Sequence, residues 1–247
     1  MMYKKGKTGT IMDSTWQPLS PTELNTDLTI KDPVQQLILA TAKKMFLEQG
    51  YLRTSLRKIA NDSGIQFQTV TSLYKTKDEV FEALVSRAML LAQQLIRQEV
   101  AATETMNAHS REIQDVYQYL FLLALELEGI DNDALVCSLY QVSYTTPSLF
   151  EKMVDRQSTF AYSMFARKFT SRQCYERVLL VRSAVGGYIM IHRFKRLMPK
   201  AELKKMLLQK ALEAFEVPER IAARLISEMM LQEPYMLDLG RKLVAMV

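Results

Sequence analysis

Amide, hydroxyl and cationic side chains gather between residues 54 and 77, and this mixture is suited to contacts with DNA. Glutamine can pair bidentately with adenine, and an aromatic ring or a threonine methyl can touch the thymine methyl group. Lysine, arginine and threonine beside helix N-termini can hold phosphates. The candidate DNA contacts are Gln66, Phe67, Gln68, Thr71 and Ser72 for bases, and Thr54, Arg57, Lys58, Lys75 and Lys77 for phosphates. The same residues can also form an ordinary solvated face, so the elements that position them matter.

Three short helices are predicted around these residues. The first begins with an aspartate cap and a proline at residues 32–33 and ends at Gly50. The second runs from a Thr54 cap to about residue 62. A Ser-Gly turn at residues 63–64 leads into a third helix of about eight residues, and these lengths indicate a helix-turn-helix.

The rest of the chain keeps a helical apolar period. A fourth helix from Lys77 is expected to be about 35 Å long at 1.5 Å per residue, long enough to join two domains. Later helices are expected to start near Asp131 or Asp133, Thr146-Pro147, Thr170 with Gln173, Pro199, Pro218 and Pro234. The predicted fold is all-α, with a flexible N-terminal arm at 1–31, a small helix-turn-helix domain at 32–76 and a larger helical bundle at 77–247.

An ordered set of small, apolar and turn residues runs through the first helices. It comprises Ile38, Leu39, Ala42, Phe46, Gly50, Tyr51, Thr54, Ser55, Ile59, Ala60, Gly64, Ile65, Thr69, Val70, Lys77 and Asp78. In residue type and spacing this set resembles the DNA-binding domain of TetR-family transcription regulators. The resemblance implies an effector-responsive repressor that binds a double-stranded DNA operator as a homodimer, with a DNA-binding domain at 32–76 and an effector-binding and dimerisation domain at 77–247 that takes a small apolar effector. A cytoplasmic location is expected because two cysteines cannot build a disulfide framework.

The third helix departs from the family pattern at several positions. Gln66 stands where most members have a serine cap, and Gln68 replaces the usual glycine. Thr71, Leu73 and Tyr74 occupy the positions of a tyrosine pair and a phenylalanine. Because those tyrosines commonly touch DNA phosphates in the family, two such contacts are missing here.

An effector pocket is expected among the middle helices, where aromatic and methionine side chains are frequent. The candidate lining residues are Phe121, Tyr140, Tyr144 and Met153. The alternative is that these side chains are ordinary core residues.

Dimerisation is predicted through the helix from Thr170 to about Met198, together with one of the later helices, such as the helix at 218–232, as a four-helix interface. Gly186 and Gly187 lie within the first of these helices, where each glycine costs about 1 kcal/mol relative to alanine, so close approach of another helix is expected to compensate for them. The 218–232 helix carries an apolar stripe of Ile221, Ala222, Leu225, Ile226, Met229 and Met230. The alternative is burial of both helices inside one subunit.

Other classes of function are disfavoured. No nucleophile, metal or phosphate-loop motif surrounds His109 or His192, so neither an enzyme nor a cofactor or metal site is expected. Neither a membrane span nor a secretion signal is expected, because apolar runs are short. The net charge of +5 suits a polyanionic partner but is too small to identify one. The competing hypothesis is a TetR-like adaptor that binds a protein partner rather than DNA.

Overall fold

The computed structural model describes residues 17–18, 32–102, 110–191 and 199–246. Within these ranges it contains eleven α-helices and no strand, so the all-α prediction is confirmed. The predicted arm, apart from residues 17–18, lies outside the described residues, as do His109 and His192. The helices are α2 (Pro33–Gln49), α3 (Leu56–Ser63), α4 (Phe67–Leu73), α5 (Lys77–Ala102), α7 (Arg111–Asn132), α8 (Ala134–Thr145), α9 (Pro147–Phe165), α10 (Ser171–Ile191), α11 (Lys200–Ala214), α12 (Glu219–Leu231) and α13 (Glu233–Met246).

Local capping bonds fix several helix starts as predicted. The Asp32 carboxylate accepts a hydrogen bond from the Val34 N–H at 2.9 Å and so caps α2. Before α10, Thr170 and Gln173 form a reciprocal capping box: the Gln173 N–H donates to the threonine hydroxyl at 3.2 Å, and the Thr170 N–H donates to the side-chain oxygen (Oε1) of Gln173 at 3.0 Å. Both patterns join residues two or three positions apart.

The start of α3 differs from the prediction by one residue. Ser55, and not Thr54, is its N-cap, because the Ser55 hydroxyl accepts from the Lys58 N–H at 3.3 Å. Helix α3 ends at Gly64, whose φ of 69° lies in the left-handed region. A glycine adopts this conformation without steric cost, and it turns the chain towards α4.

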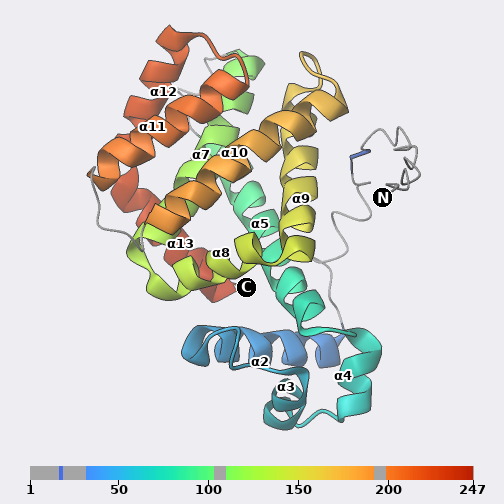
Figure 1. The fold of residues 1–247 in the computed structure, drawn as a ribbon. Coiled ribbons are helices and arrows are strands. Elements are labelled where there is room, and N and C mark those ends of the chain that lie inside the picture. Colours follow the sequence, from blue (N-terminus) through green and yellow to red (C-terminus); the bar gives the residue numbers. More distant parts are fainter. Residues whose placement is uncertain (1–16, 19–31, 103–109, 192–198, 247) are drawn as a thin grey trace, which may run out of the picture.

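A small apolar core joins α2, α3 and α4 to the first turns of α5 (Figure 1). Ile38, Ile59, Val70 and Val80 are all fully buried in it. Because Val80 and its neighbours up to Leu84 belong to this core, α5 is part of the small domain before it continues into the bundle. Helix α5 therefore packs into both cores and connects them.

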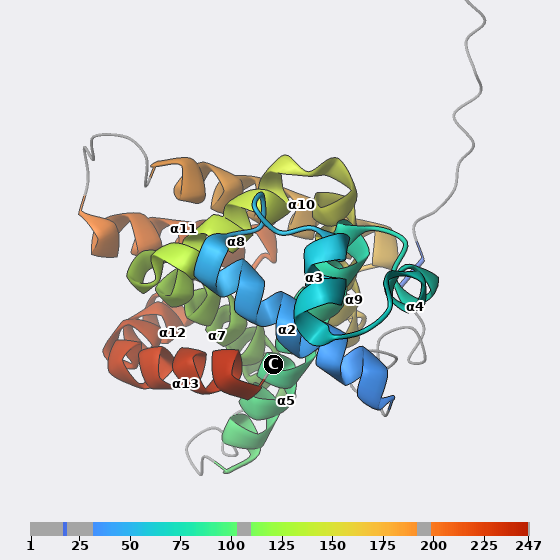
Figure 2. The same ribbon diagram turned by 90° about the horizontal axis from the view of Figure 1, so that it is seen from below.

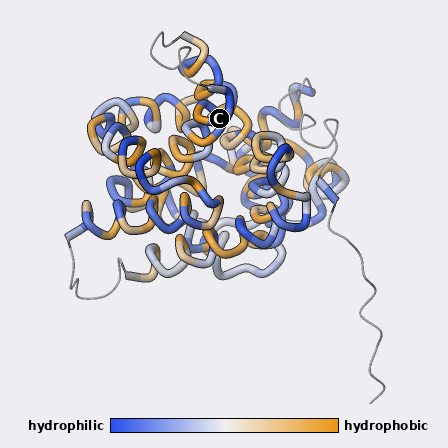
Figure 3. Tube along the Cα trace, turned by 90° about the horizontal axis from the view of Figure 1, so that it is seen from above, coloured by the Kyte–Doolittle hydropathy of each residue, from blue (hydrophilic) through white to orange (hydrophobic). Residues whose placement is uncertain are grey.

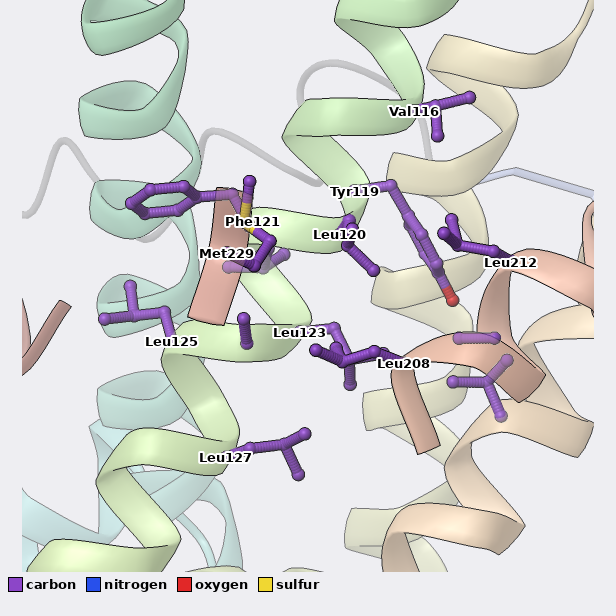
Figure 4. Close-up of a cluster of buried hydrophobic side chains, with 14 of the residues drawn as sticks. Val116, Tyr119, Leu120, Phe121, Leu123, Leu125, Leu127, Leu208, Leu212 and Met229 are labelled. Carbon is purple, nitrogen blue, oxygen red and sulfur yellow. The ribbon is translucent and has the colours of Figure 1, made fainter. Parts of the chain in front are cut away.

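Helix α7 is the centre of the larger bundle. Twelve of its 22 residues are buried, so it is covered nearly all round. Its neighbours are α5, α8, α9, α11, α12 and α13. Figure 4 shows side chains of α7 meeting Leu208 and Leu212 of α11 and Met229 of α12. Hydrophobic and hydrophilic segments alternate along the helices, as expected when each buries one face (Figure 3).

The apolar stripe of α12 lies inside the subunit. Ala222, Leu225, Ile226 and Met229 are at most 2% exposed and belong to the bundle core. Since α12 packs on α7 and α11, the prediction that this stripe forms a subunit interface is wrong. An amphipathic pattern reveals that one face is buried but does not reveal which surface covers it.

Candidate nucleic-acid interface

Helices α3 and α4 lie at the end of the molecule away from the bundle (Figure 1), and Figure 2 views the chain from this end. On α4, Gln66, Gln68 and Ser72 are exposed, and the Phe67 side chain is 40% exposed. Thr71 is half-buried. The five candidate base contacts therefore come together on one seven-residue helix and its first flanking residue.

The hydroxyl side chains of α4 donate to backbone carbonyls of the same helix, whereas the Gln66 amide does not cap it. The hydroxyl of Thr71 donates to the Phe67 carbonyl at 3.1 Å, and the hydroxyl of Ser72 donates to the Thr69 carbonyl at 2.8 Å. Gln66 makes no side-chain capping bond, as expected for a weak cap. The hydroxyls can still accept hydrogen bonds, whereas amide groups can both donate and accept.

Exposed cations flank α4. Arg57 and Lys58 on α3 and Lys75 after α4 are exposed, as predicted candidates for phosphate contacts. The Arg57 guanidinium lies over the Phe67 ring at 5.3 Å from its centroid, which orients both side chains. Sequence reasoning missed Arg53, which is exposed beside α3 and whose carbonyl accepts from the Lys58 ammonium at 3.0 Å.

Two other candidate phosphate contacts are engaged inside the domain. Thr54 is 3% exposed, and its hydroxyl donates to the Gly50 carbonyl at 3.0 Å. The Lys77 ammonium donates to the Tyr51 carbonyl at 2.9 Å and lies 3.8 Å from the centroid of the Tyr51 ring. Burial lowers the pKa of Lys77, against the opposing effect of Asp78. In this conformation both residues hold the turn before α3 in place, and their role as phosphate contacts stays a prediction.

Tyr51 holds the turn before α3 in place through its ring and its hydroxyl. Its ring packs against Phe46 and Phe81, with centroids 5.5 and 5.1 Å away. Its hydroxyl donates to the Asp78 carboxylate. Burial and the bond to Asp78 both raise the pKa of Tyr51, so the hydroxyl keeps its proton. The start of α5 is thus fixed to the turn between α2 and α3.

A cavity of about 460 Å³ lies between the small domain and the bundle. Helices α2, α5, α7, α8, α9 and α13 all contribute to its wall. Of the four predicted lining residues, Tyr140 and Met153 are in the wall, whereas Phe121 and Tyr144 are not. Phe121 instead packs against Tyr117 and Tyr235. These two positions are therefore a correction to the predicted pocket.

Tyr144 has a packing role next to α10. A Cβ atom built on Gly186 would lie 3.0 Å from the Tyr144 ring, so this glycine lets the ring approach the helix. Nothing lies within 4 Å of a Cβ built on the neighbouring Gly187. The close approach predicted for the glycine pair thus occurs at Gly186, and within one subunit.

A buried ion pair stands beside the cavity. The Arg182 guanidinium donates to the Glu126 carboxylate at 2.6 Å, and the Gln157 amide donates to the same carboxylate at 2.9 Å. The Arg182 side chain is only 1% exposed. Burial raises the pKa of Tyr144, which lies near this pair, and so favours its neutral form. Glu126 and Gln157 both line the cavity, so they provide polar groups in a mostly apolar wall.

The fold and this surface define the class of protein: a helix-turn-helix domain joined to a helical bundle. Residues 38–84 match the family model described as bacterial regulatory proteins, tetR family. The match takes in about a fifth of the chain, from α2 to the start of α5, and confirms the resemblance for these residues. No curated protein matches the chain.

Several solved structures are similar to the chain at low identity. SmeT, the repressor of the Stenotrophomonas maltophilia multidrug efflux pump SmeDEF, is 20% identical with a TM-score of 0.46, over 73% of this chain and 89% of that one. A SmeT-triclosan complex is 18% identical with a TM-score of 0.47, over 74% and 91%. AmtR of Mycobacterium smegmatis is 16% identical with a TM-score of 0.37, over 85% and 98%. TM-scores below 0.5 assign neither function nor ligand to this chain.

Neither a metal-binding cluster nor a membrane-spanning helix is found among the described residues. No three His, Cys, Asp or Glu side chains there are grouped so that they could hold a metal ion. No helix in the described ranges is both long and apolar enough to cross a bilayer.

Proposed function

We propose that this chain is a sequence-specific DNA-binding transcription regulator, and more narrowly an effector-responsive repressor. The observation that carries the proposal is the tetR-type match at residues 38–84, on a domain whose short α4 helix is exposed at one end of the molecule. Helix α4 acts as the recognition helix in the major groove, with Gln66 and Gln68 as the side chains best suited to base edges.

Phosphate contacts are proposed for the exposed cations around α4. Arg57, Lys58 and Lys75 are on the surface beside the amide side chains, and Arg53 adds a fourth cation. These charges give affinity for any DNA sequence and set its salt dependence, whereas base contacts give preference. Thr54 and Lys77 act by positioning the turn rather than by touching phosphates.

A homodimer is proposed through the outward face of α10. Leu180 and Met190 are 65% and 45% exposed there, and the small residues Ser183, Ala184 and Gly187 lie between them on the same face. Small side chains between two large apolar ones allow a second copy of the helix to approach closely about a two-fold axis. Two recognition helices can then read half-sites about 34 Å apart.

The effector is proposed to be a small, mainly apolar molecule in the cavity between the domains. The cavity volume is in the range of small-molecule sites, and Tyr140 and Met153 belong to its wall. A ligand there touches α5, which is shared by both domains. Its occupancy can therefore change the orientation of α4.

The proposal is tested by selecting binding sites from random-sequence DNA at physiological salt, followed by titration of the enriched duplex against an unrelated one. The expected result is an enriched palindromic site. Gln68→Ala is expected to relax base preference at particular positions, by roughly 1–3 kcal/mol for a lost bidentate contact. If no palindrome is enriched and binding to any DNA is independent of salt, the regulator proposal fails and an adaptor that binds a protein partner takes its place.

A further inference from the structure

The last described helix, α13, spans the distance from the bundle to the DNA-binding domain. At its beginning, Gln232 and the Tyr117 hydroxyl exchange hydrogen bonds at 3.0–3.1 Å, and Met236 and Leu239 are buried against the core. Helix α13 packs most extensively against α7. At its other end it reaches α2, as Figures 1 and 2 show. One end of α13 is thus anchored in the bundle, and the other touches the small domain.

The contact with the small domain is made by Lys43 of α2. Its ammonium donates a hydrogen bond to the Val244 carbonyl at 3.0 Å. The last four carbonyls of a helix have no partner within the helix, and the helix dipole is negative at this end. A lysine ammonium is therefore a well-matched partner for the end of α13.

Both sides of this contact line the cavity. Lys43, Phe46 and Leu47 of α2 form one part of its wall, and Gly240 and Leu243 are among the residues that α13 contributes. Gly240 has no side chain, and a Cβ built there would lie in van der Waals contact with Leu125, at 3.9 Å. A molecule in the cavity thus meets the DNA-binding domain directly, as well as the helix that is tied to it.

The two α7 carboxylates in the cavity wall are already paired inside the protein. The Glu126 carboxylate is paired with Arg182 and Gln157, and the Glu128 carboxylate with Lys204 and Asn132. Because both carboxylates already have partners inside the protein, a cationic ligand group would have to displace one of those partners.

We propose that α13 couples the cavity to the DNA-binding domain: an uncharged apolar ligand displaces the end of α13 and, through the Lys43–Val244 contact, shifts α2. This inference rests on the proposed function for its biological meaning, but the coupling itself is a property of the chain without DNA. Two other routes join the same parts of the molecule. Helix α5 is shared by both cores, and Leu139 of α8 packs against the small core. The test must therefore separate α13 from these routes.

The test uses the full chain and the uncharged fluorescent probe 1-N-phenylnaphthylamine. Probe binding is followed by its fluorescence, and amide hydrogen exchange of α2 and α13 is measured without probe and at saturating probe. Lys43→Met removes the ammonium but keeps the aliphatic stem, and Lys43→Arg restores a donor. Lys44→Met is the matched control, because Lys44 is the exposed neighbour and its loss changes the charge equally.

In the wild type we expect the probe to alter exchange in both α2 and the last turn of α13. In Lys43→Met at saturating probe, the change in α2 is expected to fall by about half or more, while Lys44→Met and Lys43→Arg respond like the wild type. Absence of probe binding, a probe response in α13 without one in α2, or an unchanged α2 response in Lys43→Met would each overturn the proposal. The last result would assign the coupling to α5 or α8.

The selected DNA duplex separates this inference from the proposed function. If the wild type binds the duplex, the probe is expected to weaken binding by about fivefold or more, and less so in Lys43→Met. An equal effect in both proteins would contradict the role of α13. If the wild type binds no duplex at all, the regulator proposal fails, and the exchange measurements still decide whether α13 couples the two parts.

Discussion

Three cations of the small domain and two of the bundle differ sharply in their surroundings. In the small domain Arg57, Lys58 and Lys75 are exposed around α4. In the bundle Arg182 and Lys204 are buried, each beside a glutamate of α7. The difference shows that residue type alone does not identify a binding residue. An exposed cation can meet a polyanion, whereas a buried cation with a carboxylate partner fixes the arrangement of helices.

Lys77 lies in the small domain but is held by an internal partner, like the buried cations of the bundle. It belongs to the small domain, and its position in the sequence predicts a phosphate contact. Its ammonium is nevertheless held by the Tyr51 carbonyl and ring, as a bundle cation is held by its partner. We therefore propose that Lys77 positions the interface, and its predicted phosphate contact is left to a test of the salt dependence of DNA binding.

The largest effect is expected from breaking the buried pair of the bundle. Arg182→Met leaves the Glu126 carboxylate buried without its cation, so we expect a loss of roughly 3–5 kcal/mol in the free energy of unfolding. Chemical denaturation measures this loss. Arg224→Met is the matched control, because Arg224 pairs with Glu228 on the surface, and it should cost at most about 1 kcal/mol. Similar losses in the two variants would contradict the comparison.

A second prediction concerns the two adjacent glycines of α10. Gly186→Ala places a methyl group 3.0 Å from the Tyr144 ring, and we expect it to destabilise the chain by about 1–3 kcal/mol. Gly187→Ala meets no atom of its own subunit, so helix propensity should stabilise the monomer by about 0.5–1 kcal/mol. If α10 is the dimer interface, Gly187→Ala weakens self-association in sedimentation equilibrium. Unchanged association would place the interface elsewhere.

The third prediction separates positioning from phosphate binding at Lys77. Lys77→Met removes the bond to the Tyr51 carbonyl, and because the site is half-buried we expect a loss of about 1 kcal/mol in stability. The slope of log affinity for DNA against log salt should stay unchanged. A slope smaller by about one would restore Lys77 as a phosphate contact.

A smaller effect is expected at the thiols. Burial raises the pKa of the Cys174 thiol to about 11, whereas Cys137 is half-buried. Since the thiolate is the reactive form, Cys174 should react with a thiol reagent at neutral pH much more slowly than Cys137. Mass spectrometry after brief alkylation identifies the modified residue. Faster modification of Cys174 would contradict its buried position.

Local features of this fold could be predicted from the sequence because their partners are close along the chain. The Asp32 cap, the Gly64 turn and the Thr170–Gln173 capping box each join residues within a few positions. The tetR-type pattern is also carried by a short, continuous segment. For such features, residue type and spacing determine the geometry.

Other features depend on contacts between distant residues. Glu126 and Arg182 are 56 positions apart, and no local pattern pairs them. Lys77 is 26 positions from Tyr51, so its partner could not be predicted from its position beside α4. Aromatic content indicated a pocket, but only the packing of helices decides that Tyr140 lines the cavity and Phe121 does not.

The most direct measurement of the central claim is the salt dependence of DNA binding by two double variants. Arg57→Ala/Lys75→Ala removes two exposed cations beside α4, and Arg172→Ala/Arg224→Ala removes two exposed cations of the bundle. Fluorescence-anisotropy titrations of the selected duplex at several salt concentrations give the slope of log affinity against log salt. Our account predicts a slope reduced by about two per subunit in the first variant and unchanged in the second. Equal slopes in wild type and both variants would contradict the assignment of the α3–α4 surface as the DNA interface.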